Sequence, residues 1–174
     1  MLWLQIVKGF IQVLRSGQTP RQIAGGFALG AMVGLMPFFS LQSLFLWFVI
    51  LVLDVNLSAT LLAVTLFALV AYVLDPLMHA LGYFLLVDSP SLHSLWMSLY
   101  NAPIAPLTRF NNTVVLGSLV AGLLLFLPVY FGMRRFVLAY RTHLHTRVER
   151  LRIYQVVSKS TIVKWYDRIK NITS

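Results

Sequence analysis

The sequence predicts an all-α integral membrane protein with broken or re-entrant helical blocks, one clear C-terminal transmembrane helix and amphipathic interfacial helices. Of its 174 residues, 59% are hydrophobic and 11% are charged, and the mean hydropathy is +0.80. Because soluble domains carry about 25% charged residues, this composition indicates a chain that lies largely in lipid. The length allows one membrane domain, residues 1–133, followed by a tail, residues 134–174.

Two apolar blocks form the centre of the predicted membrane domain. They cover residues 20–53 and 57–87 and are joined by Asp54-Val-Asn56. Pro37 interrupts the first block and Asp75-Pro76 ends the helix in the second, because proline lacks an amide donor and clashes with the preceding turn. The two pieces around Pro37 cover about 21 and 24 Å, less than the ~30 Å hydrocarbon core. We therefore expect kinked spans or re-entrant hairpins.

Other segments have clearer patterns. Residues 2–16 and 91–100 have one apolar and one polar helical face, which predicts helices in the membrane interface. Thr19-Pro-Arg-Gln22 is a capping box with proline at the first helical position. Residues 113–133 form the cleanest span, about 32 Å without a charge. The tail has a basic amphipathic pattern, and we expect these residues to bind the membrane surface: Lys159, Lys164, Trp165, Arg168 and Lys170.

Helix starts and close packing are also predicted inside the blocks. Ser40 or Ser43 can cap the piece that follows Pro37, and Asn56 can contribute to the turn and cap between the blocks. In the last span, Ser118 and Gly122 form a small-residue pair of the kind that packs against a neighbouring helix.

A glycine face runs along the first helix. Gly26, Gly30 and Gly34 recur every four residues, so one side of the helix is nearly bare of side chains. Such a face lets another helix approach closely, and in membranes this is its ordinary use. The alternative is a passage for a lipid substrate. The sequence leaves both interpretations open.

An acidic and a histidine residue lie in the second block. Asp75 is expected to cap a helix that begins at Pro76, and His79 falls one turn later on the same face. One interpretation is a cap beside an imidazole. The other is a site that gates or carries a proton, because ionisable residues at membrane depth are costly and usually functional.

The distribution of basic residues predicts the topology. Ten of the fourteen Lys and Arg residues follow residue 133, whereas residues 88–112 contain only Arg109. Since Lys and Arg mark cytoplasmic flanks, both termini are expected inside and residues 88–112 outside a bacterial inner membrane, which the chain crosses more than once. An odd number of crossings then lies between residues 21 and 88. The charge of +9 predicts anionic lipid headgroups as partners, and no nucleic acid.

The sequence contains no pattern of a known enzyme class. It lacks a phosphate-binding glycine loop, HExxH and GxSxG, and it contains no cysteine. His143 and His145 are two residues apart and point to different sides of a helix, so they are poor joint metal ligands. We therefore expect no enzyme activity, no cofactor and no metal.

A series of small, proline and polar residues at fixed spacing resembles a bacterial inner-membrane family, domain of unknown function 2062. The series covers about residues 10–88 and includes Thr19-Pro-Arg-Gln-Ile-Ala-Gly-Gly-Phe-Ala-Leu-Gly30, Gly34-Leu-Met-Pro37, Gln42-Ser43, Val55-Asn56-Leu57-Ser58 and Asp75-Pro76-Leu77. In that family the second break is usually Asn-Pro, so the carboxylate is peculiar to this chain. Some relatives resemble fusions to glycosyltransferases, which implies lipid-linked envelope chemistry.

The expected function is to help transport or present an anionic envelope lipid, a phospholipid or a polyprenyl phosphate. Paired interrupted hydrophobic segments are the best sequence indication of a transporter site. In this hypothesis Arg21 attracts the phosphate, the glycine face admits acyl chains, and Asp75 with His79 gates or carries a proton. The candidate residues are Arg21, Gly26, Gly30, Gly34, Gln42, Asn56, Asp75 and His79. The alternative is a non-transporting adaptor or scaffold subunit that anchors a larger envelope complex through the glycine face and the basic tail. The expected protein partner is an envelope protein or a further copy of the chain in a homo-oligomer.

Overall fold

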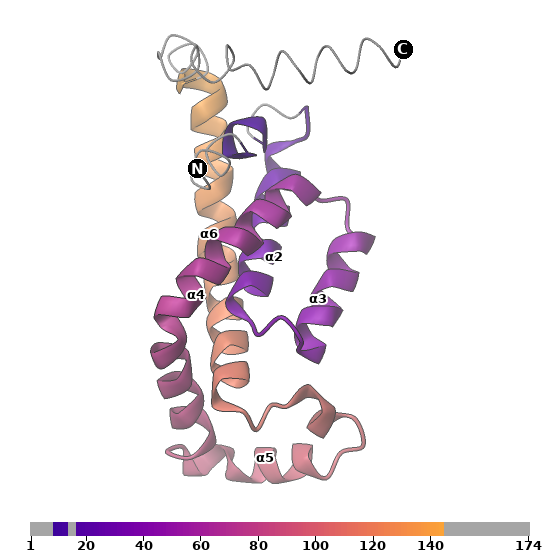
Figure 1. Ribbon diagram of the computed structural model, residues 1–174, viewed down its shortest axis with the longest axis vertical. Helices are drawn as coiled ribbons and strands as arrows, with labels where there is room; N and C mark the ends of the chain where they lie inside the picture. The colour runs from indigo at the N-terminus through magenta and orange to yellow at the C-terminus, as the bar shows by residue number, and fades with distance from the viewer. Residues whose placement is uncertain (1–8, 14–16, 145–174) are drawn as a thin grey trace. The chain divides into compact units, whose positions relative to one another are not determined.

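The computed structural model describes residues 9–13 and 17–144, and within these residues every regular element is helical. The prediction of an all-helical fold is therefore confirmed for this part. The helices, drawn in Figure 1, are α2 (Pro20–Leu35), α3 (Leu41–Val52), α4 (Leu57–Leu86), η1 (Pro90–Leu92), α5 (His93–Tyr100), η2 (Ala105–Thr108), α6 (Thr113–Ala139) and the π-helical η3 (Tyr140–Leu144).

The chain divides into two compact units, residues 1–137 and 138–174. In the second unit, the described residues form the end of α6 and η3, so the last span continues as a helix past Arg134-Arg135, as expected. Of the predicted interfacial helix 2–16, residues 9–13 are helical. The rest of that helix lies outside the described residues, as do the expected surface-binding residues Lys159, Lys164, Trp165, Arg168 and Lys170.

Polar side chains at four positions fix where the long helices begin. The capping box of α2 is confirmed, since the Thr19 hydroxyl accepts from the Gln22 amide while the Gln22 side chain accepts from the Thr19 amide. Ser40, not Ser43, caps α3, and its hydroxyl accepts from the Ser43 amide at 3.2 Å. The remaining two caps are Asn56, which accepts from the Ala59 amide, and Asn112, which accepts from the Val115 amide.

Helices α2 and α3 form a helical hairpin, which Figure 1 shows beside α4 and α6. The turn at Pro37 separates the two helices, so the predicted break in the first block is confirmed. At the other end, the Gln22 side chain donates to Asp54 Oδ2 at 2.6 Å, and the Asn56 amide donates to the Gln22 carbonyl at 3.1 Å. These bonds hold the start of α2 to the end of α3. The chain therefore enters and leaves the hairpin at the same end.

The glycine face of α2 packs against the first half of α4. A Cβ atom at Gly26 would lie 2.5 Å from the Asn56 carbonyl oxygen, and one at Gly34 would lie 2.7 Å from that of Val64. At Gly30 it would collide with the Thr60 carbonyl oxygen. Because the contacted residues advance in step along both helices, α2 and this part of α4 run parallel, in close backbone contact.

Helix α4 continues through Asp75-Pro76, so the prediction that a helix ends there is wrong. The helix has Pro76 in its interior, and Figure 1 shows α4 changing direction along its length. Proline costs one hydrogen bond and bends the helix. A complete break would expose several more backbone groups, which are costly to leave unpaired in an apolar environment. Kinking is therefore the less costly outcome, and Asp75 is an interior helical residue and not a cap.

The second half of α4 crosses the start of α6 through two further glycines. A Cβ atom at Gly82 would collide with the Thr113 carbonyl oxygen, and one at Gly117 would collide with that of Met78. Sequence reasoning did not single out this crossing. The predicted small-residue pair on α6 is buried as expected, and Gly122 lies against Met32 of α2.

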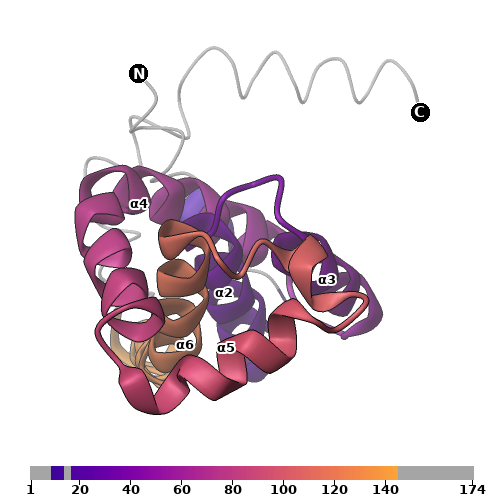
Figure 2. The ribbon, with the colours of Figure 1, turned by 90° about the horizontal axis from the view of Figure 1, so that it is seen from below.

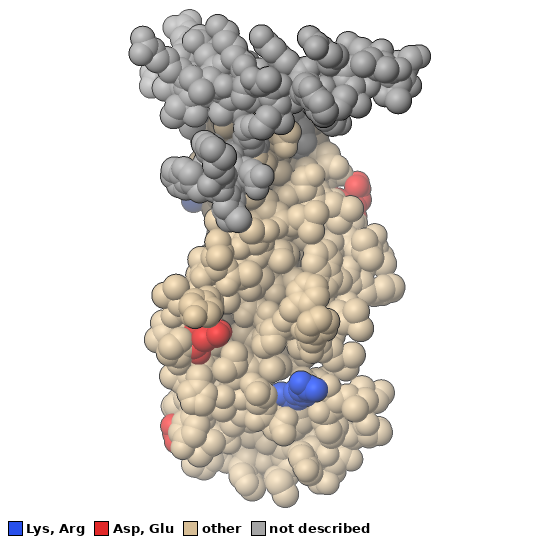
Figure 3. Space-filling model, in the orientation of Figure 1, with Lys and Arg blue, Asp and Glu red and all other residues tan. Residues whose placement is uncertain are grey.

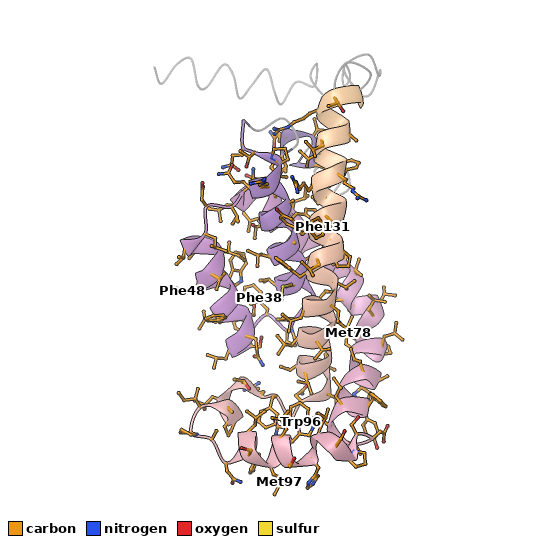
Figure 4. The ribbon with its side chains drawn as sticks, turned by 180° about the vertical axis from the view of Figure 1, so that it is seen from behind. Phe38, Phe48, Met78, Trp96, Met97 and Phe131 are labelled. Atoms are coloured by element: carbon orange, nitrogen blue, oxygen red, sulfur yellow. The ribbon has the colours of Figure 1, made fainter. Side chains whose placement is uncertain are left out.

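Helix α5 closes one end of the first unit, as Figure 2 shows from that end. Trp96 donates its indole N–H to the Leu85 carbonyl at 2.8 Å and stacks on Phe110, with 5.9 Å between ring centroids. Figure 4 shows Trp96 pointing toward the interior and Met97 pointing away from it, and Met97 is 53% exposed. Helix α5 therefore has one face packed on the fold and one face open.

The outer surface of the described residues is apolar. Figure 3 shows few charged side chains on it. Two helices are long and apolar enough to cross a membrane, Leu57–Leu86 and Thr113–Thr142, and only 17% and 28% of their most apolar windows are buried. Core helices of soluble proteins are mostly buried, so these two helices are more typical of a membrane protein.

Candidate functional site

Positions along α6 show how far other parts of the first unit lie from its Thr113 end. Its charge-free part, from Thr113 to Met133, is about 32 Å long, close to the ~30 Å hydrocarbon core. The contact between Gly122 and Met32 places the end of α2 roughly 14 Å from the Thr113 end. Helix α2 begins twelve residues earlier, about 18 Å farther along, near the level of Arg134. The open end of the hairpin therefore lies at the Arg134 end, and its tip points toward the Thr113 end.

An apolar groove lies between α3 and α6, near the tip of the hairpin. Its volume is about 580 Å³, within the ~300–1,000 Å³ range of small-molecule sites. Phe45 and Phe48 of α3 line one wall, and Leu119 and Leu123 of α6 line the other. The two leucines lie about 9 and 15 Å from Thr113 along α6. The groove thus lies beside the charge-free part of α6, in the half nearer the Thr113 end.

Gln42 provides the main polar group of this groove. Its side-chain Nε2 donates to the Thr108 carbonyl at 2.8 Å, and both residues line the groove, whose other lining residues are apolar. The Oε1 atom of Gln42 is buried and has no hydrogen-bond partner among the described residues. A buried acceptor without a donor is costly. A ligand that carries a hydroxyl or ammonium group would provide this donor.

Arg109 follows Thr108 directly and is exposed. Its backbone has φ 54° and ψ 33°, in the left-handed region that non-glycine residues rarely adopt. Such strain is common at functional sites. The position therefore places a permanent positive charge next to a residue of the groove wall. Sequence reasoning used Arg109 only for topology, because no local pattern connects it to Gln42, 67 positions earlier.

The predicted residues Arg21 and Asn56 lie at the opposite end of the hairpin. Arg21 is exposed in the first turn of α2, whereas Asn56 is buried and caps α4. Gln22 and Asp54 are hydrogen-bonded to each other beside them. This end therefore has one exposed cation and a pair of hydrogen-bonded side chains, and it lies about 15 Å along α3 from Gln42 of the groove.

Gly26, Gly30 and Gly34 do not line a passage. The backbone of α4 occupies the space next to all three, so the expectation that acyl chains pass along this face is wrong. The physical reason is that the segment of α4 from Asn56 to Ala68 runs parallel to α2 in backbone contact. The packing interpretation of the glycine face is the one that the geometry supports.

Asp75 and His79 are both exposed on α4. His79 Nδ1 lies 2.6 Å from Thr113 Oγ1, which connects α4 to the start of α6. Because the Met78 carbonyl faces Gly117, Asp75 lies about 10 Å inside the level of Thr113. The two residues therefore lie nearer the Thr113 end than the midplane, and on the outside of the fold.

The comparisons with known proteins agree on the family. Residues 5–145 match the family described as "Uncharacterized protein conserved in bacteria (DUF2062)". An uncharacterised protein of Treponema pallidum (strain Nichols) is 33% identical over 151 residues, which cover 87% of this chain and 93% of that protein. No solved structure matches the chain. The chain therefore belongs to the DUF2062 family of uncharacterised bacterial proteins.

Proposed function

We propose that this protein is a small bacterial inner-membrane protein, without enzyme activity, that helps to transport or present an anionic lipid. The observation that carries this proposal is the apolar groove of about 580 Å³ between α3 and α6, with Gln42 and Thr108 as its polar residues. An acyl or prenyl chain occupies the groove. The phosphate of the lipid lies toward Arg109, and a hydroxyl group of a glycerol headgroup lies toward the buried Oε1 atom of Gln42, to which it can donate.

The arrangement of the hairpin supports this proposal. We interpret α2 and α3 as a re-entrant hairpin that enters from the cytoplasm and returns to it, because Gln22 and Asp54 hold its two ends together. Helices α4 and α6 are then the two crossings. Only α4 lies between residues 21 and 88, which gives the odd number required there. Non-helical backbone at membrane depth is tolerated where protein or a cavity surrounds it, and the hairpin turn adjoins the groove. Arg21 and Arg109 would bind lipid phosphates at the inner and outer ends.

Filling the groove tests the lipid site. Replacing Leu123 with tryptophan places a large ring in the groove, so the purified full-length protein should retain less phospholipid, measured by lipid mass spectrometry after extraction in mild detergent. Leu124→Trp is the matched control, because Leu124 is 68% exposed on the same helix and does not line the groove. Equal lipid retention by both variants, with unchanged melting temperature, would contradict the groove assignment.

A substitution of Arg109 tests recognition of the lipid headgroup separately from binding of the lipid chain. An Arg near a membrane surface contributes about 1 kcal/mol toward anionic lipids, so Arg109→Ala should reduce the retention of phosphatidylglycerol on the order of fivefold. Retention of a zwitterionic lipid should change little. A uniform loss of both lipids would show that Arg109 supports the fold of residues 105–112 and does not select the headgroup.

The topology in this proposal has a direct measurement. The chain has no cysteine, so a single Asn111→Cys variant carries the only thiol. In intact cells we expect a membrane-impermeant maleimide to label it from the outer side, because the Lys and Arg asymmetry places residues 88–112 outside. A cysteine at Arg21 provides the control that should be labelled only after the inner side is opened. Labelling of Asn111→Cys only from the inside would refute the topology.

The second candidate function is that of a membrane adaptor without transport. The tip of the hairpin favours it, because Phe39 is 92% exposed and Phe38 is 63% exposed, and their rings contact each other edge to face. Exposed aromatic pairs are typical contact residues of protein interfaces. In this case Leu123→Trp would leave the adaptor function unchanged, whereas replacing both Phe38 and Phe39 would abolish it.

A further inference from the structure

A stripe of polar and small residues runs along the exposed side of α4. We name it the α4 stripe and define it by Thr65, Ala68, Tyr72, Asp75 and His79, all of which are exposed. The spacing alternates between three and four residues, which is the a/d spacing of helices that pair along a seam. The side chains that pack against α2 and α6, such as Ala63 and Met78, are on other sides of the helix. Within the described residues, His79 contacts Thr113 and the backbone nitrogen of Ala68 lies beside Gly34, but all five residues of the stripe remain exposed.

The α4 stripe exposes an ionisable residue, Asp75, well inside a helix that is a candidate membrane span. Asp75 is about 10 Å inside the level of Thr113, on a helix that is long and apolar enough to cross a membrane. Ionisable residues within membrane spans almost always face protein or a water-filled cavity and pair with a partner. In one chain, Asp75 faces outward. The carboxylate therefore requires a covering surface that residues 9–13 and 17–144 of one chain do not provide.

We propose that a second copy of this chain covers the stripe, with the two α4 helices parallel and related by a two-fold axis along the membrane normal. In a two-fold interface the same patch meets itself, so it must hold both donors and acceptors. The stripe does: Asp75 of one copy accepts from the Tyr72 hydroxyl of the other copy, which lies about one turn away along the parallel seam. His79 binds Thr113 through Nδ1, which leaves Nε2 as the nitrogen that faces a second copy.

The residue at the centre of the proposed seam has a small side chain. Ala68 lies between Thr65 and Tyr72, and small residues let two membrane helices approach closely, with hydrogen bonds across the interface adding to the packing. The rest of the exposed surface of α4 is mostly apolar, and among its large side chains Val73 is 73% exposed and Leu77 is 64% exposed. Those positions suit lipid. The polar stripe suits a helix that offers the same groups.

Cross-linking of the full-length protein in native membranes tests the seam. Because the natural chain has no cysteine, Ala68→Cys introduces one thiol per copy. Mild oxidation should then give a disulfide-linked dimer of twice the monomer mass on a non-reducing gel. Val73→Cys is the matched control, since Val73 is also exposed but lies about 100° around the helix from Tyr72. It should remain monomeric.

A second measurement does not depend on disulfide geometry. Ala68→Trp adds bulk at an exposed position, so each chain should fold normally but no longer pair, and its mass by light scattering in detergent should fall to half that of the natural protein. Val73→Trp should keep the dimer mass. Equal cross-linking at positions 68 and 73, a monomeric natural protein in both assays, or cross-linking of Ala68→Cys to a different protein would each overturn the proposal.

Discussion

Replacing Gly117 with alanine is expected to destabilise the protein strongly, because the crossing of α4 and α6 leaves no room for one more carbon atom. The new Cβ atom would collide with the Met78 carbonyl oxygen and would lie 2.8 Å from its carbon and 3.1 Å from the Gly82 amide nitrogen. All of these are backbone atoms, so no side-chain rotation relieves the contact. The two helices must separate, which also breaks the contact between His79 and Thr113.

The expected cost is about 1–3 kcal/mol or more of the free energy of unfolding, as for other overpacked sites. It would appear as a lower melting temperature of the purified protein in detergent. Gly132→Ala is the matched control, because nothing lies within 4 Å of a Cβ atom at Gly132 on the same helix. Since alanine is favoured over glycine in helices, that variant should be neutral or slightly more stable. Equal melting of both variants would disprove the close crossing of α4 and α6.

Replacing Gly30 with leucine is expected to have the second large effect, because it inserts a branched side chain between α2 and α4. Even the Cβ atom would lie 2.9 Å from the Thr60 Cα atom and 3.0 Å from the Ala63 Cβ atom. We expect a loss of about 1–3 kcal/mol and a lower melting temperature in detergent.

The same variant distinguishes packing from passage. If the glycine face admitted lipid, Gly30→Leu would leave the melting temperature nearly unchanged and would reduce lipid association. Gly132→Leu serves as the control for added bulk on an open helix surface. A Gly30→Leu protein with unchanged melting and unchanged lipid retention would show that neither interpretation of this face is right.

Local signals in the sequence predicted the starts of helices and the all-helical class. Thr19, Pro20 and Gln22 form the predicted capping box, and Ser40 caps the helix after Pro37. These features depend on residues within one turn of each other, so they can be read without the fold. The apolar composition is equally local, because it needs no knowledge of which residues meet.

The wrong and missed predictions concern features that tertiary packing determines. At Asp75-Pro76 the local signal for a helix end is strong, but contacts of Met78 and Gly82 with α6 favour a kinked helix over a broken one. The groove was missed because its polar residues, Gln42 and Thr108, are 66 positions apart. Of the predicted site residues, only Gln42 lines this groove, while the three glycines face α4.

The parallel contact of α2 with α4 determines the order in which the fold can be completed during synthesis. Helix α2 leaves the ribosome first, but the surface that covers its glycines extends to Ala68. Until that segment has been made, the glycines of α2 lack the backbone that covers them, whereas Asp54 and Asn56, the partners of Gln22, are made before α4 begins. Helix α2 therefore acquires the backbone that covers its glycines only after the first part of α4 has been made, later than its neighbour α3.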